Sequence, residues 1–265
     1  LWQEVLREVE QQGTRYGHAN IGTGRRVLIE YVSANPTGPL HVGHGRGAAV
    51  GQAVIRLLRA VGYDVVGEYY INDAGRQMKL LGASVYARYR ELSGETIQFP
   101  EDGYHGTYIT EVAQRIKAQL DKVAVDMPPD DLETRCRMLA YRELMELIRD
   151  DLTVFGIEIQ SWFSEASLLE SKAVERALDE LKARDLLFEQ DGAWWFRSSK
   201  YGDEKDRVVR KQDGQLTYLA SDIAYHHDKL RRGYDLLIDV LGADHHGYIH
   251  RMEAVMQAYG HPKER

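Results

Sequence analysis

Cysteine is nearly absent from this 265-residue sequence, which contains only Cys136. A single cysteine excludes an intrachain disulfide framework and any cysteine-rich zinc site. We expect Cys136 to be a buried helix residue. Apolar runs are also short: none approaches the roughly 20 residues that a membrane-spanning helix needs, and no charged-then-apolar leader opens the chain. These absences predict a cytoplasmic protein with no membrane partner.

Positive charge is in the minority. Lys and Arg number 34 against 41 Asp and Glu, which gives a formal net charge of −7. Nucleic-acid affinity comes largely from Lys and Arg that neutralise phosphates, so this balance argues against a surface that coats DNA or RNA generally. An RNA contact must be local, and DNA is not an expected partner.

The remaining composition is that of an ordinary globular protein, with 43% hydrophobic and 28% charged residues. We expect one large domain that carries a large insertion. The chain starts at Leu1 and ends on the polar string GHPKER. We expect both ends to be cut from something longer.

Hydrophobic patterning predicts an α/β fold. Residues 27–32 (VLIEYV) form an apolar run of strand length, the apolar positions after Gly45 recur at helical spacing, and residues 65–71 read as a second strand. A strand–helix–strand unit of this length requires a right-handed parallel crossover. Residues 236–241 (LLIDVL) predict another buried strand, followed by a helix around residues 252–259.

The segment between about residues 93 and 205 has a mostly helical pattern. Apolar spacing predicts helices around residues 109–123 and 174–181, with a break at Pro128-Pro129 between the first helix and the next. Short strands are predicted at residues 193–197 and as a hairpin of residues 208–209 with 216–219, joined across Asp213-Gly214. Residues 2–12 predict a linker helix that ends at Gly13. The core stripe of the second helix is predicted to be Met138, Tyr141, Met145, Ile148, Leu152 and Phe155.

The most informative segment, NPTGPLHVGHGR at residues 35–46, lies between a predicted strand and the helix that follows it. Sheets of α/β proteins bind nucleotides at this position, where the helix offers unpaired N–H groups to phosphate oxygens. His41 and His44 can donate hydrogen bonds to phosphates, and Gly43 lets a flat base or a phosphate approach the backbone. Two other interpretations are a metal site, although the zincin pattern is absent, and plain loop histidines.

The run EYVSANPTGPLHVGHGRG at residues 30–47 resembles the signature region of class I aminoacyl-tRNA synthetases, in the form found in arginyl-tRNA synthetases. TYLASDIAYHHDKL at residues 217–230 and GADHHGYIHRM at residues 242–252 resemble the same family, in the same order. The resemblance implies a Rossmann-like parallel sheet with a large, mostly helical α+β insertion. It also implies a division into a linker helix (1–23), the first half of the catalytic domain (24–92), a connective insertion (93–205) and the second half (206–265).

Site residues follow from the resemblance, position by position. The ATP site would comprise Pro36, Thr37, Gly38, His41, Gly43, His44, Gly45, Gly242, Asp244 and His245, with His41 and His44 as the catalytic pair. The arginine site would comprise Glu30, Ser33, Asn35, Tyr218, Asp222 and His246, although His245 and His246 can exchange roles. No protein metal site is expected. His105, His226 and His227 are interpreted as surface or structural residues.

Two of these carboxylates also have a physical argument behind them. A guanidinium is planar and permanently charged, so its partners should be carboxylates and a hydroxyl. Glu30 lies in an otherwise apolar strand and is costly there unless a cationic ligand or an internal cation pairs with it. Asp222 follows Ser221, a possible helix cap, and an acid in a first helical turn tends to stay ionised.

The resemblance implies that arginine attacks the α-phosphate of ATP, with Mg²⁺, to form arginyl-adenylate, and that the arginyl group then passes to tRNA(Arg). Arginine activation would need bound tRNA. The alternatives are a small-molecule nucleotidyltransferase, a non-catalytic tRNA-binding module and another class I synthetase.

Two parts of the family pattern are not found in this sequence: the Lys-Met-Ser-Lys-Ser-like loop and the helical anticodon-binding domain. We therefore predict that these 265 residues alone bind ATP or arginine weakly and have little or no aminoacylation activity. A tRNA-charging assay checks this prediction, and full synthetase activity would contradict it.

Overall fold

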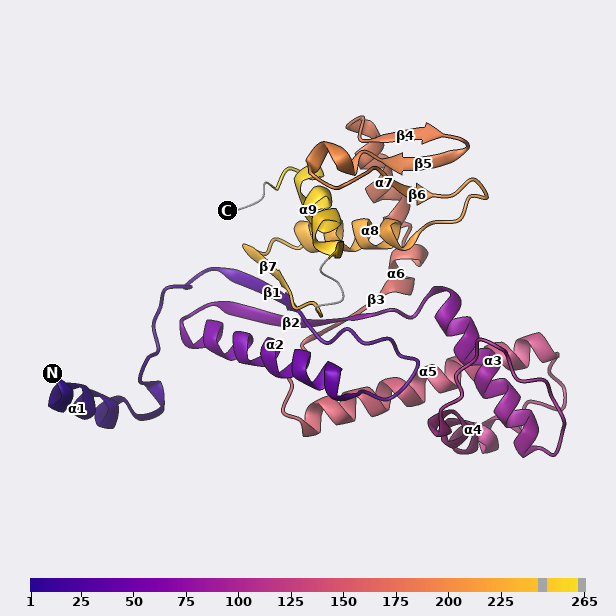
Figure 1. Ribbon diagram of the computed structural model, residues 1–265. Coiled ribbons are helices and arrows are strands. Elements are labelled where there is room, and N and C mark those ends of the chain that lie inside the picture. Colours follow the sequence, from indigo (N-terminus) through magenta and orange to yellow (C-terminus); the bar gives the residue numbers. More distant parts are fainter. Residues whose placement is uncertain (243–246, 262–265) are drawn as a thin grey trace.

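A four-stranded parallel sheet forms the centre of the molecule. The structure is a computed structural model that describes residues 1–242 and 247–261 (Figure 1). The strand order is β3-β2-β1-β7, with bounds Arg26–Glu30 for β1, Asp64–Ile71 for β2, Ser161–Ser164 for β3 and Leu236–Asp239 for β7. All three pairings are parallel, which confirms the predicted α/β class and the parallel β1–β2 crossover. Strands β1 and β7 each end two residues before their predicted apolar runs do.

The two faces of the sheet differ in chemistry. Val27 and Ile29 of β1 belong to the apolar core beneath α2 (Val42–Ala60), together with Val65 and Tyr69 of β2. Because strand side chains alternate, the residues between them point to the opposite face. That face is covered by α8 (Tyr218–Arg231), and Figure 1 shows α2 and α8 on opposite sides of the sheet.

Helix α2 lies very close to strand β1. Tyr31, just after β1, is buried, and its ring fills the space where a side chain of Gly51 would project. Glycine at position 51 therefore sets how near the helix lies to the sheet, because any Cβ would collide with the ring.

Three helices form a separate core beside the sheet: α3 (Gly75–Leu92), α4 (Thr107–Leu120) and α5 (Pro129–Val154). Cys136 is buried there, as predicted. The predicted stripe of α5 is partly wrong, since Met138 is 54% and Phe155 57% exposed. The reason is that this long helix serves two cores. Its first half packs on α3 and α4 through Leu132, Cys136, Leu139, Ala140 and Leu144, and its second half packs under the sheet through Met145, Ile148 and Leu152.

A further core lies on the α8 side of the sheet. It joins α6 (Glu165–Glu170), α7 (Ala173–Ala183), α8 and α9 (Ile249–Ala258) to a small antiparallel sheet of order β4-β5-β6, with β4 Leu187–Gln190, β5 Ala193–Phe196 and β6 Arg207–Arg210. Short 3₁₀ turns span Gly13–Arg15 and Ser198–Tyr201. Strands β3, β4 and β5 fall within the predicted insertion, residues 93–205, and β6 lies just after it. Strand β3 nevertheless completes the parallel sheet.

The predicted hairpin strand at residues 216–219 is wrong. Only Leu216 forms a bridge, to Arg210, and Tyr218 is already the first residue of α8. Thr217 explains the change: its N–H bonds to the Val209 carbonyl, and its extended backbone makes it the N-cap of the helix.

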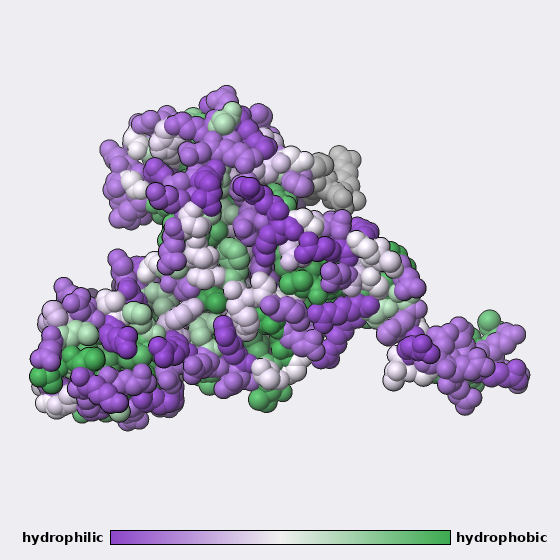
Figure 2. Space-filling model, turned by 180° about the vertical axis from the view of Figure 1, so that it is seen from behind, coloured by the Kyte–Doolittle hydropathy of each residue, from purple (hydrophilic) through white to green (hydrophobic). Residues whose placement is uncertain are grey.

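Helix α1 (Trp2–Gln12) stands apart from the rest of the molecule, as Figure 2 shows, and buries none of its residues. It ends at Gly13, as predicted. Within the described residues, no helix has both the length and the apolar character to cross a membrane.

We predict that Gly51→Ala destabilises the fold by about 1–3 kcal/mol, because the new methyl group overpacks the contact with Tyr31. Urea unfolding followed by circular dichroism measures the effect. Gly47→Ala in the same helix is the matched control: nothing lies near its Cβ, so helix propensity alone should stabilise that variant by up to about 1 kcal/mol. Equal effects of the two substitutions would contradict the packing argument.

Candidate active site

The carboxyl ends of the parallel strands meet at one edge of the sheet, and β1 is the point where the topology divides. From β1 the chain passes through α2 to β2 on one side, whereas β7 joins β1 on the other side. Open α/β sheets bind ligands in the crevice outside such a point. The loop of residues 31–41 leaves β1 there and leads to the histidine pair.

His41 and His44 hold each other through the first turn of α2. His41 Nδ1 accepts from the Gly43 N–H at 3.1 Å, and His44 Nδ1 accepts from the His41 N–H at 3.3 Å. The rings stack with centroids 3.7 Å apart. Because both Nδ1 atoms accept, the proton of each neutral ring lies on Nε2, and both Nε2–H groups are available as donors. Two such donors beside a helix N-terminus suit phosphate oxygens.

The helix begins at Val42 rather than at Gly45, because the two histidines cap it, so Gly43 lies in the first turn. A Cβ on Gly43 would lie 2.9 Å from His41 Cε1. Glycine at this position therefore leaves room for the His41 ring, besides leaving the backbone open to a ligand. Burial, and then the neighbouring His41, lower the pKa of His44, which favours its neutral form.

The loop between β1 and α2 is fixed from both sides. The Tyr69 hydroxyl donates to the Ala34 carbonyl at 2.7 Å, and the Tyr108 hydroxyl of α4 donates to the Thr37 carbonyl at 2.9 Å. Val32 and Ser33 have φ of 69° and 39°, in the left-handed region that β-branched residues in particular avoid. Such strain persists only where surrounding contacts enforce it, and it concentrates at functional sites.

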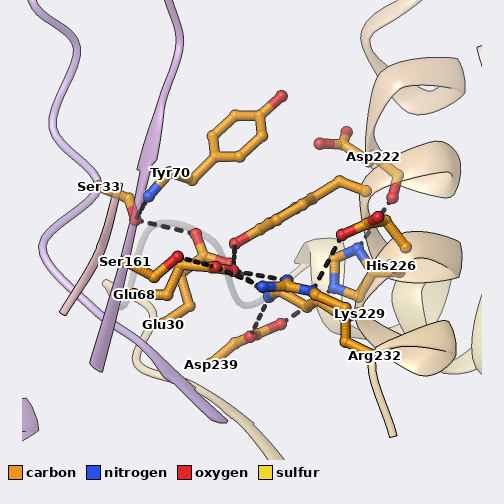
Figure 3. A network of polar contacts seen from close by, with 12 residues as sticks. Glu30, Ser33, Glu68, Tyr70, Ser161, Asp222, His226, Lys229, Arg232 and Asp239 are labelled. Carbon is orange, nitrogen blue, oxygen red and sulfur yellow. Dashed lines mark hydrogen bonds and ion pairs between the residues drawn. The ribbon is translucent and has the colours of Figure 1, made fainter. Parts of the chain in front are cut away.

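Three carboxylates lie in one row across the sheet, under α8 (Figure 3). Glu30 of β1 is paired in register with Glu68 of β2 and with Asp239 of β7, so all three side chains leave the same face. Neighbouring strands are about 4.8 Å apart, a spacing at which unpaired buried carboxylates would repel strongly.

Helix α8 supplies the countercharges. Arg232, just after the helix, donates two hydrogen bonds to the fully buried Glu68 at 2.6 and 2.8 Å, and Tyr225 Oη donates a third at 2.8 Å. Burial alone would raise the pKa of Glu68, but the hydrogen bonds from Arg232 and its neighbours outweigh burial and leave it below its ordinary value.

Lys229, which is 1% exposed, joins the other two acids. Its Nζ donates to Glu30 Oε2 at 2.5 Å and to Asp239 Oδ1 at 2.7 Å. The sequence predicts a cation beside Glu30, either a ligand or an internal one, and the structure provides the internal one. Ser33 Oγ donates to the other Glu30 oxygen at 2.9 Å, so both oxygens of this carboxylate have a partner.

Among the described residues, no lysine or arginine forms an ion pair with a second group of acids around Tyr70. Burial raises the pKa of the Tyr70 hydroxyl, and the carboxylates of Glu165, Asp222, Glu30 and Asp73 raise it further. Asp73 is used structurally, since it accepts from the Tyr141 and Ser164 hydroxyls and from the Ala166 N–H at the start of α6. Asp222 and Glu165 remain as buried or partly buried acids that face Tyr70.

The expectation that Asp222 stays ionised in a first helical turn is wrong. Thr217, not Ser221, is the N-cap, so Asp222 lies in the second turn. Burial raises the pKa of Asp222 to about 7; the positive charge of His226 opposes this rise and Glu165 adds to it. The Tyr248 hydroxyl donates to the Asp222 carboxylate. An acid with this pKa favours a bound cation or a proton.

Glu165 was missed by the sequence analysis. It follows β3 directly, is buried, and has its pKa raised by burial, while hydrogen bonds from Ser221 and Tyr70 oppose the rise. No local pattern marks it, because its place beside Asp222 depends on β3 joining the sheet next to β2. His226, interpreted as surface or structural, is buried in the network of Figure 3.

The other predicted residues are spread around this edge. Tyr218 opens α8 and is 65% exposed, and Asn35 and Gly242 are exposed while Pro36 and Thr37 are buried. Asp244, His245 and His246 lie outside the described residues. Within residues 1–242 and 247–261, no group of three or more His, Cys, Asp or Glu side chains is arranged to hold a metal ion.

Comparison with known proteins places this arrangement in a family. The family model described as "tRNA synthetases class I (R), catalytic domain" matches residues 5–265. The arginine–tRNA ligase of Nitratidesulfovibrio vulgaris (strain DSM 19637 / Miyazaki F) is 54% identical over 265 residues, which covers 100% of this chain and 48% of that protein. The arginine–tRNA ligase of Lawsonia intracellularis is 50% identical over 261 residues, covering 98% and 47%. The chain thus spans about half the length of the curated relatives it matches.

Solved structures agree. One named as an arginyl-tRNA synthetase from Campylobacter jejuni is 39% identical and superposes with a TM-score of 0.87, covering 97% of this chain and 56% of that chain. The Thermus thermophilus arginyl-tRNA synthetase, at 24% identity and a TM-score of 0.57, shares the fold. The predicted Rossmann-like class I fold is therefore confirmed, and the chain belongs to the class I arginyl-tRNA synthetase family, within its catalytic domain.

Proposed function

We propose that the protein containing this chain is an arginine–tRNA ligase, which activates L-arginine with ATP and transfers it to tRNA(Arg). The observation that carries the proposal is a pair of acids whose pKa is raised by burial, Asp222 and Glu165, at the same sheet edge as the histidine pair. One group suits a cationic side chain and the other suits phosphates. Family membership supports the same reaction.

The guanidinium of arginine would lie between Asp222 and Glu165, near the Tyr218 hydroxyl. Glu30 is a weaker candidate for this contact than the sequence predicts, because Lys229 and Ser33 already occupy its two oxygens. We assign Asn35 and His246 to the α-amino and carboxylate end of the amino acid.

ATP would bind along the loop and the first turn of α2. His41 and His44 would donate from Nε2 to the phosphates, where charge builds up as pyrophosphate leaves. Pro36, Thr37 and Gly38 would line the site with Gly43 and Gly45, and Gly242, Asp244 and His245 would hold the ribose and base. Mg²⁺ would enter with the phosphates of ATP.

A small-molecule nucleotidyltransferase would also use paired histidines, but its reaction does not require a pair of acids that can bind a guanidinium. A non-catalytic tRNA-binding module would need neither group. The presence of both groups at one edge therefore favours the ligase over the two alternatives.

We predict that, in the protein extended to the length of its relatives, Asp222→Asn weakens arginine binding at least about 100-fold, because a buried charged contact is worth roughly 3 kcal/mol or more. Glu165→Gln should have a similar effect. Calorimetry with arginine, lysine and citrulline measures it, and arginine alone should bind tightly to the unmodified protein. Asp213→Asn, in an exposed turn, is the control. Unchanged arginine binding in both site variants would contradict the assignment.

Arginine recognition should also depend on pH. Because the pKa of Asp222 is raised to about 7, the carboxyl is protonated below that pH, and a guanidinium must displace the proton. The KM for arginine should therefore rise about tenfold for each pH unit below 7. Steady-state kinetics between pH 5.5 and 9 give the profile. A KM that is flat across pH 7 would exclude Asp222 as the partner.

His44→Asn should lower the rate of tRNA-dependent ATP–pyrophosphate exchange by about 100-fold, since one donor to the developing charge is lost. The KM for arginine should change little, because the ring lies at the phosphate end. His105→Asn is the matched control: His105 is an exposed residue whose ring contacts Phe99 at a tilt of 41°. Equal rates for the two variants would remove His44 from the mechanism.

A further inference from the structure

His226 has acceptors on both sides of its ring. Its Nδ1 lies 2.9 Å from the main-chain oxygen of Asp222, and its Nε2 lies 3.0 Å from Asp239 Oδ2. A carbonyl oxygen can only accept, so Nδ1 carries a hydrogen. The Asp239 oxygen can only accept while that group is ionised, so Nε2 carries one too. A ring with both nitrogens protonated is an imidazolium.

The charges of the row lead to the same conclusion. Glu30, Glu68 and Asp239 contribute three negative charges on adjacent strands, whereas Lys229 and Arg232 contribute two positive ones. A buried row stays costly until it is neutral. The third positive charge can come from His226, which contacts Asp239 directly.

We infer that His226 is a positioning residue for arginine: as an imidazolium it ties Asp239, at the end of β7, to the turn of α8 that carries Asp222. The inference rests on the proposed function, since it concerns how that site is set for its substrate. Asp239 is also the last residue of β7, before the segment that reaches Gly242. One ring thus links the amino-acid pocket to the strand that leads toward the expected ATP loop.

Some charged groups around His226 raise its pKa and others lower it. Asp239 faces it from β7, Lys229 and Asp222 lie on α8 with Tyr225, and Glu30 of β1 is reached through Lys229. Burial and Lys229 lower the pKa of His226, but Asp239 and the Asp222 carbonyl raise it more, so it lies above its ordinary value. Burial raises the pKa of Asp239, but Lys229 and His226 hold it far below its ordinary value.

This charge has a consequence for Asp222. The imidazolium lies one turn along the same helix and opposes protonation of the Asp222 carboxyl. Without it, Asp222 should hold its proton to a higher pH. Arginine would then compete with that proton over a wider range, although its other contacts are unchanged.

The test uses the protein at the full length of its relatives, with tRNA, and compares His226→Gln with His227→Gln. His227 is the matched control, because it is the adjacent residue on α8 but contacts Glu180 of α7, away from the site. The KM for arginine and kcat are measured from pH 5.5 to 9. For His226→Gln, the pH below which the KM for arginine begins to rise, which follows the pKa of Asp222, should move up by about one pH unit. The KM at pH 7.5 should then rise about threefold with little change in kcat, and the difference should vanish by pH 9.

His227→Gln should follow the unmodified protein throughout. A purely structural role for His226 predicts a loss that is the same at every pH, and that result would overturn the inference while the proposed function stands. An unmodified protein that does not activate arginine would overturn the proposed function, and the inference with it. Should His226→Gln fail to fold, ring ¹⁵N shifts of His226 in the unmodified protein decide: two protonated nitrogens at pH 7.5 support the inference, and one unprotonated nitrogen overturns it.

Discussion

The row of carboxylates across β2, β1 and β7 is the constraint on which the site depends. Three acids in register on neighbouring strands can be buried only under an element that carries matching cations, and α8 does so with His226, Lys229 and, just beyond its end, Arg232. Buried ion pairs contribute little net stability, but they fix geometry, since any other placement of α8 leaves a charge unpaired. The position of α8 in turn sets Tyr218 and Asp222 at the carboxyl end of β1.

Once the row is neutral, the acids beside it are the groups that the proposed function assigns to arginine. Among the described residues, no lysine or arginine is paired with Asp222 or Glu165, whereas Glu30 is already held by Lys229 and Ser33. The strained turn at Val32 and Ser33 serves the same contacts. It places Ser33 Oγ where it donates to Glu30 and accepts from the Tyr70 N–H at 3.0 Å. From there the chain continues into the histidine pair. In the proposed function, one loop thus joins the arginine site to the phosphate site.

The sequence pattern predicted those features that depend on residues close together in the chain. Strand β1, helix α2 and the histidine pair follow from residues near in sequence, and Glu30 in an apolar strand predicted a cation beside it. The row itself could not be predicted, because Glu68 and Asp239 come into register with Glu30 only through strand pairing, and Lys229 reads as an ordinary helix charge. Glu165 depends on β3 joining the sheet. The Asp213-Gly214 turn predicted a strand through Tyr218, but Thr217 caps a helix there.

The central claim is that Asp222 exchanges a proton for the guanidinium of arginine. Calorimetric titration of the full-length protein with arginine near pH 7, in two buffers of different ionisation enthalpy, counts that proton directly. About half a proton should be released at pH 7, because Asp222 has a pKa of about 7. Arginine binding with no proton release at pH 7 would contradict it.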